Sequence, residues 1–254
     1  MQSRQGVSGT ILWLTGWGMS DGAFDRLRRF LPDFGHVSVD FSTAVTPEEM
    51  LNRTEQAAKD SLSFCSGPLL IGGWSLGGLL ALRLGAKGLA DGLVLLSATA
   101  RFIRPRGQSD LGWADVYVRQ MIAGLRKERQ AVEDHFRQMV FTEEELADGL
   151  RENLPLIGGW TTPALIAGLQ VLRDVECLSG LPEISCPALL VHGTEDSICP
   201  YAAAEEMLAQ LPRATLIPLP GSGHAPFLGK EIYLAESLRR WWNEQQKNSA
   251  KTSI

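Results

Sequence analysis

Short apolar runs alternate with longer amphipathic stretches over the first 100 residues, and apolar runs return after residue 180. We expect a strand at each run: Thr10–Leu14, His36–Phe41, Pro68–Gly72, Gly92–Ser97, Pro187–His192 and Ala214–Leu219. Buried strands of four to six residues separated by helices are typical of βα units. The pattern therefore predicts an α/β fold, with a mostly parallel sheet and helices on both of its faces.

The amphipathic stretch after the second run, Thr46–Leu62, carries its own start signal. Thr46 is followed by Pro47, at the first helical position, and by Glu49 three residues on. This spacing is a capping box, in which the threonine and glutamate side chains accept backbone N–H groups at the helix start. We expect a helix that begins here.

The alternation of short apolar runs and amphipathic stretches is interrupted between residues 101 and 180. This stretch has no convincing strand, and apolar positions recur at helical spacing over Val116–Leu125, Gln130–Val140, Glu143–Leu150 and Pro163–Leu172. We interpret residues 101–180 as a helical cap inserted into a core of residues 1–100 and 181–254. The alternative is a set of extra helices packed on a face of the sheet.

A candidate nucleophile lies in a strand–turn–helix segment over residues 69–80. Its turn reads G-x-S-x-G, as Gly73-Trp74-Ser75-Leu76-Gly77. A serine nucleophile projects from such a sharp turn only when small residues flank it, because the backbone closes tightly there. The string alone is a weak signal, but a strand before it and a helix after it favour Ser75 as a nucleophile. The alternative is a glycine-rich helix start used for packing.

A serine hydroxyl needs a general base, and His224 has the right place in the chain. It lies on a loop after the last strand, which gives the order serine, acid, histidine of an α/β hydrolase. Asp196 follows a strand 28 residues earlier and is the expected acid, with Glu195 as its rival. Asp40 is expected to be a turn carboxylate. The histidines that do not fit the role of base are His36, His135 and His192.

An oxyanion hole requires two backbone N–H groups aimed at one point. We expect one from Leu76, directly after the serine at a helix start, and the other from Trp17, in the glycine-rich loop after the first strand. The side chains expected to line the substrate site are Trp17, Trp74 and Phe136. For both tryptophans a structural place in the core is an equally good interpretation.

Composition places the chain among ordinary globular proteins. It has 254 residues, 44% hydrophobic and 21% charged, which excludes a disordered or collagen-like chain and allows a substantial core. The 24 basic and 29 acidic side chains leave a net charge of −5, which argues against nucleic-acid binding. The chain has no H-x-x-x-H, no clustered carboxylates and no G-x-G-x-x-G after a strand, so we predict no metal and no cofactor.

The cysteines and the N-terminal residues indicate the cellular compartment of the protein. The four cysteines are scattered without a C-x-x-C pair, which favours free thiols in a reducing cytoplasm over a structural bridge. The apolar run at residues 11–14 is too short for a signal peptide, and no stretch of about 18 apolar residues occurs. We expect a cytoplasmic monomer that has no membrane partner.

Several of these motifs together resemble one family of α/β hydrolases, the biotin-pathway carboxylesterases that act on pimeloyl-acyl-carrier-protein methyl ester. The resemblance rests on Gly16-Trp17-Gly18, Gly73-Trp74-Ser75-Leu76-Gly77-Gly78, Leu165–Leu172 and His224-Ala225-Pro226-Phe227. Trp74 is the most discriminating position, because many relatives carry histidine directly before the serine.

The resemblance implies a serine carboxylesterase that hydrolyses this methyl ester in biotin biosynthesis, through a Ser-His-Asp triad and an acyl-enzyme. It also implies that arginines on the cap meet the acidic carrier protein, here Arg119, Arg126 and Arg129. Between residues 101 and 129, seven basic side chains stand against three acidic ones, a balance that suits an acidic partner. For any single arginine, an ordinary solvated helix surface is the alternative.

Three features depart from the family pattern. Thr15 stands where the family has histidine, and His135 falls in a cap helix where the family tends to have arginine. Only about nine residues precede the first apolar run, so the usual leading strand pair is expected to be shortened or missing. Two other functions stay open: a short-acyl carboxylesterase or thioesterase without a carrier partner, and a non-catalytic binding protein with a hydrolase fold.

Overall fold

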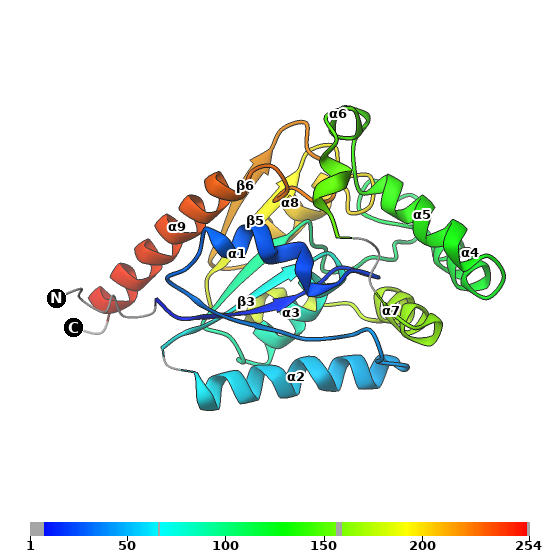
Figure 1. The fold of residues 1–254 in the computed structure, drawn as a ribbon. Helices are drawn as coiled ribbons and strands as arrows, with labels where there is room; N and C mark the ends of the chain where they lie inside the picture. Colours follow the sequence, from blue (N-terminus) through cyan, green and yellow to red (C-terminus); the bar gives the residue numbers. More distant parts are fainter. Residues whose placement is uncertain (1–7, 66, 156–158, 253–254) are drawn as a thin grey trace.

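The computed structural model describes residues 8–65, 67–155 and 159–252, and a parallel sheet of six strands forms its centre (Figure 1). The strands are β1 (Thr10–Leu14), β2 (Gly35–Ser38), β3 (Leu69–Trp74), β4 (Gly92–Leu96), β5 (Ala188–Gly193) and β6 (Ala214–Leu219). Their order is β2-β1-β3-β4-β5-β6, and each neighbouring pair is parallel. The predicted α/β fold is confirmed.

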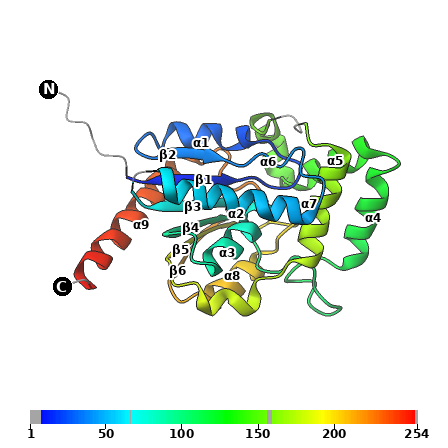
Figure 2. The ribbon, with the colours of Figure 1, turned by 90° about the horizontal axis from the view of Figure 1, so that it is seen from below.

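Helices cover both faces of this sheet (Figures 1 and 2). One face carries α1 (Asp25–Arg29) and α9 (Glu231–Thr252), and the other carries α2 (Pro47–Phe64), α3 (Leu76–Ala86) and α8 (Tyr201–Gln210). Two 3-10 helices, η1 (Asp21–Phe24) and η3 (Leu178–Glu183), complete these layers. The inner strands β1, β3, β4 and β5 are buried along their whole length, as parallel strands are when helices cover both faces.

The second strand is shorter than its apolar run predicts. It ends at Ser38 instead of Phe41, because the chain turns at Asp40. The Asp40 carboxylate accepts hydrogen bonds from the backbone N–H of Ser42 at 2.8 Å and from the Ser42 hydroxyl at 3.0 Å. Such a turn competes with strand pairing, and Asp40 is the turn carboxylate that we expected.

The start of α2 differs in one bond from the predicted capping box. The Thr46 hydroxyl accepts the backbone N–H of Glu49 at 3.1 Å, as expected. The Glu49 carboxylate, however, accepts the N–H of Val45 at 3.0 Å, one residue before the N-cap. The helix still begins where the sequence predicts, since the bond from Thr46 satisfies an N–H that has no partner within the helix.

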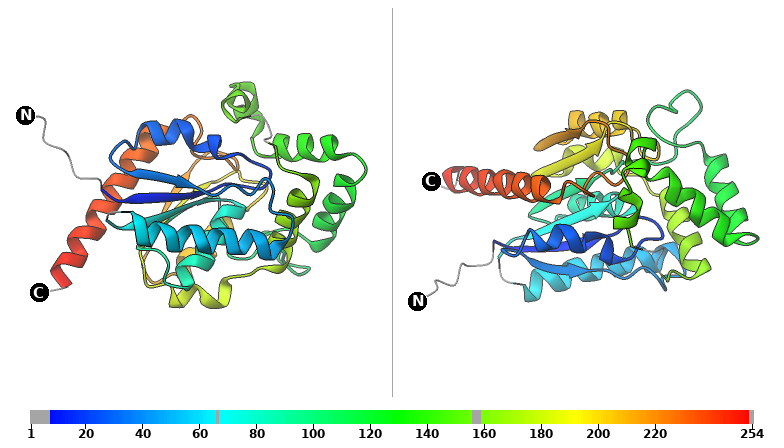
Figure 3. Two further views of the ribbon diagram at one scale, coloured as in Figure 1. Left: turned by 60° about the horizontal axis from the view of Figure 1, so that its bottom comes forward. Right: turned by 45° about the horizontal axis from the view of Figure 1, so that its top comes forward.

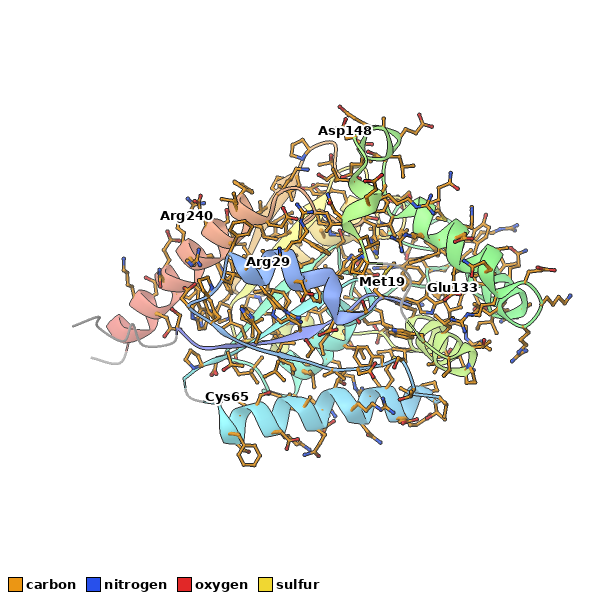
Figure 4. All side chains as sticks on the ribbon, viewed as in Figure 1. Met19, Arg29, Cys65, Glu133, Asp148 and Arg240 are labelled. Carbon is orange, nitrogen blue, oxygen red and sulfur yellow. The ribbon has the colours of Figure 1, made fainter. Side chains whose placement is uncertain are left out.

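The helices between β4 and β5 lie together beyond the carboxyl ends of the strands (Figure 3). They are α4 (Asp115–Leu125), α5 (Arg129–Met139), α6 (Glu143–Ala147), the 3-10 helix η2 (Leu150–Asn153) and α7 (Thr162–Asp174). In the described part of residues 101–180, extended pairing is limited to two isolated bridges. The Trp160 indole connects this region to the core by donating to the carbonyl of Met19 at 3.1 Å; Met19 is labelled in Figure 4. The boundaries of the cap as a unit stay a prediction.

No strand precedes β1 within the described residues, which start at residue 8. Residues 1–7, on which the expected loss of a leading strand pair partly depends, lie outside the described part of the chain.

Candidate active site

Ser75 occupies a strained turn between β3 and α3. Its backbone has φ 55° and ψ −116°, a region that residues with a side chain rarely adopt. The flanking glycines allow this turn: a Cβ on Gly77 would lie 2.0 Å from the carbonyl oxygen of Leu14, and one on Gly73 would lie 2.3 Å from the carbonyl oxygen of Gly77. The predicted requirement for small residues around Ser75 thus has a direct steric cause.

Asp196 lies in the loop after β5, where its buried carboxylate is held by several donors. One oxygen accepts the backbone N–H groups of Ile198 and Cys199, both at 2.9 Å. The other lies 2.8 Å from Nδ1 of His224. Glu195, the rival acid, is exposed. The histidine is therefore paired with the aspartate that the sequence favoured.

His224 lies in the loop between β6 and α9, with its imidazole buried. Because Nδ1 faces the Asp196 carboxylate, this nitrogen carries the proton in the neutral ring, which leaves Nε2 as an acceptor. Nε2 is buried and has no hydrogen-bond partner among the described residues. An unoccupied acceptor on a ring oriented by a carboxylate is the arrangement that a general base requires.

Trp74 joins the serine turn to the loop of the histidine. Its indole N–H donates to the carbonyl oxygen of His224 at 2.7 Å, and its ring packs edge-on against Phe227 at 5.2 Å. The side chain is buried. These contacts give Trp74 a structural place in the core, and its predicted contact with substrate stays a prediction.

His192 is a site residue that the sequence reasoning set aside. This buried side chain at the end of β5 donates from Nε2 to the carbonyl of Cys199 at 2.7 Å, and the same nitrogen lies 3.4 Å from Asp196 Oδ2. Burial alone would raise the pKa of Asp196, but the nearby charge of His224 and hydrogen bonds from both histidines hold that pKa well below its usual range. Only the i, i+4 spacing of His192 and Asp196 hinted at this contact.

The loop after β1 passes directly against the serine turn. A Cβ on Gly16 would lie 3.5 Å from Cβ of Ser75 and 3.2 Å from the Trp74 ring, so the loop backbone approaches closely. Leu76 is the first residue of α3, and N–H groups in the first turn of a helix have no acceptor within it. Both predicted oxyanion donors, from Trp17 and Leu76, thus belong to segments that adjoin Ser75.

The side chain of Trp17 links this loop to the helices beyond the sheet. Its indole N–H donates to the carbonyl of Leu165 in α7 at 2.7 Å, and its ring lies 4.8 Å from that of Phe136 in α5. Phe136 also lines a cavity of about 850 Å³ between α4, α5 and residues 104–114. The two aromatic rings therefore connect the candidate oxyanion loop with a largely apolar cavity.

The three arginines expected to meet a carrier protein differ in their surroundings. Arg129 binds Glu133 (Figure 4) at 2.8 Å and donates to the carbonyl of Trp160 at 2.8 Å. Arg119 pairs with Asp115 on the exposed surface of α4. Arg126 is exposed and makes no ion pair with any described residue. Of the three, Arg126 keeps its charge most available to a partner.

The remaining histidines have other surroundings. His36 accepts the indole N–H of Trp13 at 3.1 Å, and His135 is exposed on α5 and lines the same cavity as Phe136. Within the described ranges, no group of three histidine, cysteine, aspartate or glutamate side chains is placed to hold a metal ion. In that same part of the chain, no helix is both long and apolar enough to cross a membrane.

Comparison with known proteins places the chain in a family. The model of the alpha/beta hydrolase family matches residues 11–232, so the chain belongs to this family. A protein from Nitrosomonas europaea, named pimeloyl-[acyl-carrier protein] methyl ester esterase, is 31% identical over 227 residues, which are 86% of this chain and 89% of that protein. A protein of the same name from Xanthomonas oryzae is 28% identical over 244 residues, 91% and 94% of the two chains.

Solved structures share the fold. An esterase from Exiguobacterium antarcticum matches with a TM-score of 0.77 at 22% identity, over 94% of this chain and 93% of the other. A bromoperoxidase from Bacillus anthracis matches with a TM-score of 0.78 at 14% identity, over 94% and 93%. At these identities the likeness concerns the fold alone.

Proposed function

We propose that the chain is a serine carboxylesterase with Ser75 as nucleophile, His224 as general base and Asp196 as the residue that orients the base. The pairing of His224 Nδ1 with Asp196 at 2.8 Å, with Nε2 left unpartnered, carries this proposal. Ser75 attacks the ester carbonyl while Nε2 accepts its proton. The backbone N–H groups of Trp17 and Leu76 stabilise the oxyanion.

The second half of the reaction uses the same groups. His224 returns its proton to the departing alcohol, and an acyl ester of Ser75 remains. A water molecule, deprotonated by His224, then attacks this ester, and His224 returns that proton to the departing Ser75 oxygen as the carboxylic acid is released. The reaction needs no cofactor, because every proton transfer has a partner within the site.

For the substrate, we propose the methyl ester of a pimeloyl chain linked to an acyl-carrier protein, as in biotin biosynthesis. The names of the relatives from Nitrosomonas europaea and Xanthomonas oryzae support this choice. The cavity beside Phe136 offers apolar walls for an acyl chain, lined by side chains such as Trp113, Met121 and Val132. Exposed Arg126, directly after α4, is the candidate contact for an acidic carrier, with Arg119 within α4 and Arg129 turned to other contacts.

A second candidate is a short-acyl carboxylesterase or thioesterase without a carrier partner. This candidate is favoured because two of the three arginines expected to meet a carrier protein already form ion pairs within the chain. Arg119 pairs with Asp115, and Arg129 pairs with Glu133. The non-catalytic alternative is disfavoured, since a binding protein has no need of a strained serine turn or of a buried His–Asp pair.

The test compares wild-type protein with Ser75→Ala on a free methyl ester and on its carrier-linked form. We expect the variant to lose at least a thousandfold in kcat on both substrates, and to lose labelling by a fluorophosphonate probe, with an unchanged circular-dichroism spectrum. Full activity of the variant would remove Ser75 from the mechanism.

The same test separates the two candidate substrates. Preference of the wild type for the carrier-linked ester, together with rescue of a biotin auxotroph that lacks its esterase, supports the carrier substrate. Equal rates on both esters without rescue favour the general esterase.

A further inference from the structure

Glu145, in the short helix α6, makes more contacts than its own helix requires. Its backbone N–H donates to the Thr142 hydroxyl at 3.1 Å, and its carboxylate accepts the Thr142 N–H at 3.0 Å. These two bonds form a complete capping box. Such a box normally serves only the helix that it starts.

The same carboxylate oxygen reaches the loop that carries His224. Oε2 of Glu145 accepts the backbone N–H of Gly223 at 3.1 Å, 78 residues further along the chain. Glu145 is buried, at 7% exposed, and makes no ion pair within the described residues. A buried carboxylate is costly unless hydrogen-bond donors satisfy it. The donors here are two backbone N–H groups, that of Thr142 at the start of α6 and that of Gly223 in the loop of His224.

Two further bonds hold the segment before Glu145 against the site. The backbone N–H of His224 donates to the carbonyl of Val140 at 2.8 Å. The Ser197 hydroxyl, next to Asp196, donates to the carbonyl of Met139 at 3.3 Å. Residues 139–145 therefore contact both the loop of the acid and the loop of the base.

The approach at Gly223 is too close for a side chain. A Cβ there would lie 2.7 Å from the carbonyl oxygen of Val140 and 2.9 Å from the Glu145 carboxylate. Residues 139–145 thus pack directly against the backbone of Gly223, the residue before His224. The position of Glu145 is therefore linked to the position of His224.

We propose that Glu145 is a positioning residue, which fixes the loop of His224 from the side of the helices beyond the sheet. This inference rests on the proposed function, in which His224 is the base. The loop has no regular structure, and its other anchors include the Asp196 carboxylate on the His224 ring, the Trp74 indole on the His224 carbonyl and the Glu195 N–H on the carbonyl of Ser222 at 3.0 Å. Loss of Glu145 leaves the N–H of Gly223, directly before the histidine, without its acceptor, and misplacement of a catalytic group lowers the rate steeply.

The test uses three variants on a small free methyl ester, such as methyl butyrate. Glu145→Ala removes the acceptor, and we expect kcat to fall about 10- to 100-fold with KM within twofold of wild type. Glu145→Gln keeps one carbonyl oxygen, and since both N–H groups donate to one oxygen, we expect kcat within about threefold of wild type. Thr142→Ala breaks the other half of the capping box and leaves the bond to Gly223 intact.

Thr142→Ala is the matched control, since it weakens the start of α6 without touching the loop. We expect it to lower the thermal midpoint as Glu145→Ala does but to keep wild-type kcat. Wild-type kcat in Glu145→Ala, or an equal loss in Thr142→Ala, would overturn the inference. Ser75→Ala, measured alongside, separates this outcome from failure of the proposed mechanism, because only the latter leaves Ser75→Ala active.

Discussion

At the scale of single residues, the site is organised around one buried charge. The Asp196 carboxylate accepts hydrogen bonds from two backbone N–H groups and from His224, and His192 lies at 3.4 Å. An isolated charge in this position would be very costly, and convergent donors are what make it tolerable. They also fix the direction of the carboxylate, and through it the orientation of the His224 ring.

His192 allows this arrangement to be tested. In His192→Phe, the carbonyl of Cys199 loses its donor and Asp196 loses a polar neighbour at 3.4 Å, and we expect kcat/KM on a free methyl ester to fall about tenfold, or about 1.4 kcal/mol. His192→Gln restores an N–H donor, and we expect it to recover most of that loss. Steady-state kinetics on both variants provide the measurement. Equal losses in the two variants would show that the packing of the ring matters and its hydrogen bond does not.

Sequence reasoning selected candidate site residues by their order along the chain, and it selected none whose proposed role depends on a distant contact. Ser75, Asp196 and His224 each follow a strand, so the topology itself brings them to one edge of the sheet. Glu145 acts on a loop 78 residues away, and nothing in its local pattern beyond a capping box announces that contact. His192 was set aside as a base, and the structure shows its Nε2 donating to the carbonyl of Cys199 beside the Asp196 carboxylate.

At the scale of elements, the apolar runs predicted the strands closely, and β2 is the exception. Each inner strand is covered by helices on both faces, so its apolar run matches the observed strand to within about two residues. β2 lies at the edge of the sheet and is only half-buried. The edge strand β6 is also only partly buried and yet spans its predicted run, so the early end of β2 is due to the turn at Asp40.

The same edge is tied to the last helix by an ion pair that gives a pH-dependent prediction. Burial alone would raise the pKa of Asp33, but hydrogen bonds and the charge of Arg239 in α9 lower it below the ordinary value of 3.8. The pair therefore stabilises the fold above about pH 4 and is lost as the pH falls through the lowered value. We expect Asp33→Asn to lower the free energy of unfolding by about 0.5 to 1 kcal/mol at pH 7.

Urea unfolding of both proteins at pH 7 and pH 2.5 checks the sign of this effect. We expect the difference between wild type and Asp33→Asn to shrink at the lower pH, because pH 2.5 lies below the ordinary pKa of 3.8 and the contribution is lost as the pH falls toward the lowered pKa of the folded protein. A difference that stays constant with pH would mean that the contribution of Asp33 is not electrostatic.

At the scale of the whole molecule, the structure reduces the number of unpaired basic side chains in residues 101–129, where the sequence indicated an excess of positive charge. Of the seven basic side chains between residues 101 and 129, three are committed to partners within the chain: Arg104 to Glu206, Arg119 to Asp115 and Arg129 to Glu133. Counting charges along the sequence cannot reveal these pairs, since Glu133 and Glu206 lie outside the counted stretch. Of the four basic side chains that remain, Arg126 and Lys127 are both exposed and adjacent at the turn between α4 and α5.

This turn is where a carrier-linked substrate should be sensitive to charge. We expect the double variant Arg126→Glu, Lys127→Glu to lower kcat/KM on the carrier-linked methyl ester about tenfold at 50 mM salt, because reversal replaces attraction to an acidic carrier by repulsion. The loss should shrink at 500 mM salt, where the screening length is short. The rate on a free methyl ester should not change, since neither side chain lines the cavity beside Phe136.

Arg240→Glu supplies a matched control, because Arg240 is also exposed but lies on α9, away from α4 and α5 (Figure 4). If the turn is the docking surface, this variant keeps the wild-type rate on the carrier-linked ester at both salt concentrations. A similar loss in the control would point to the net charge of the molecule as the cause, since any charge reversal would then act alike. Wild-type rates in all variants would remove the carrier contact from the turn and leave the general esterase as the better account.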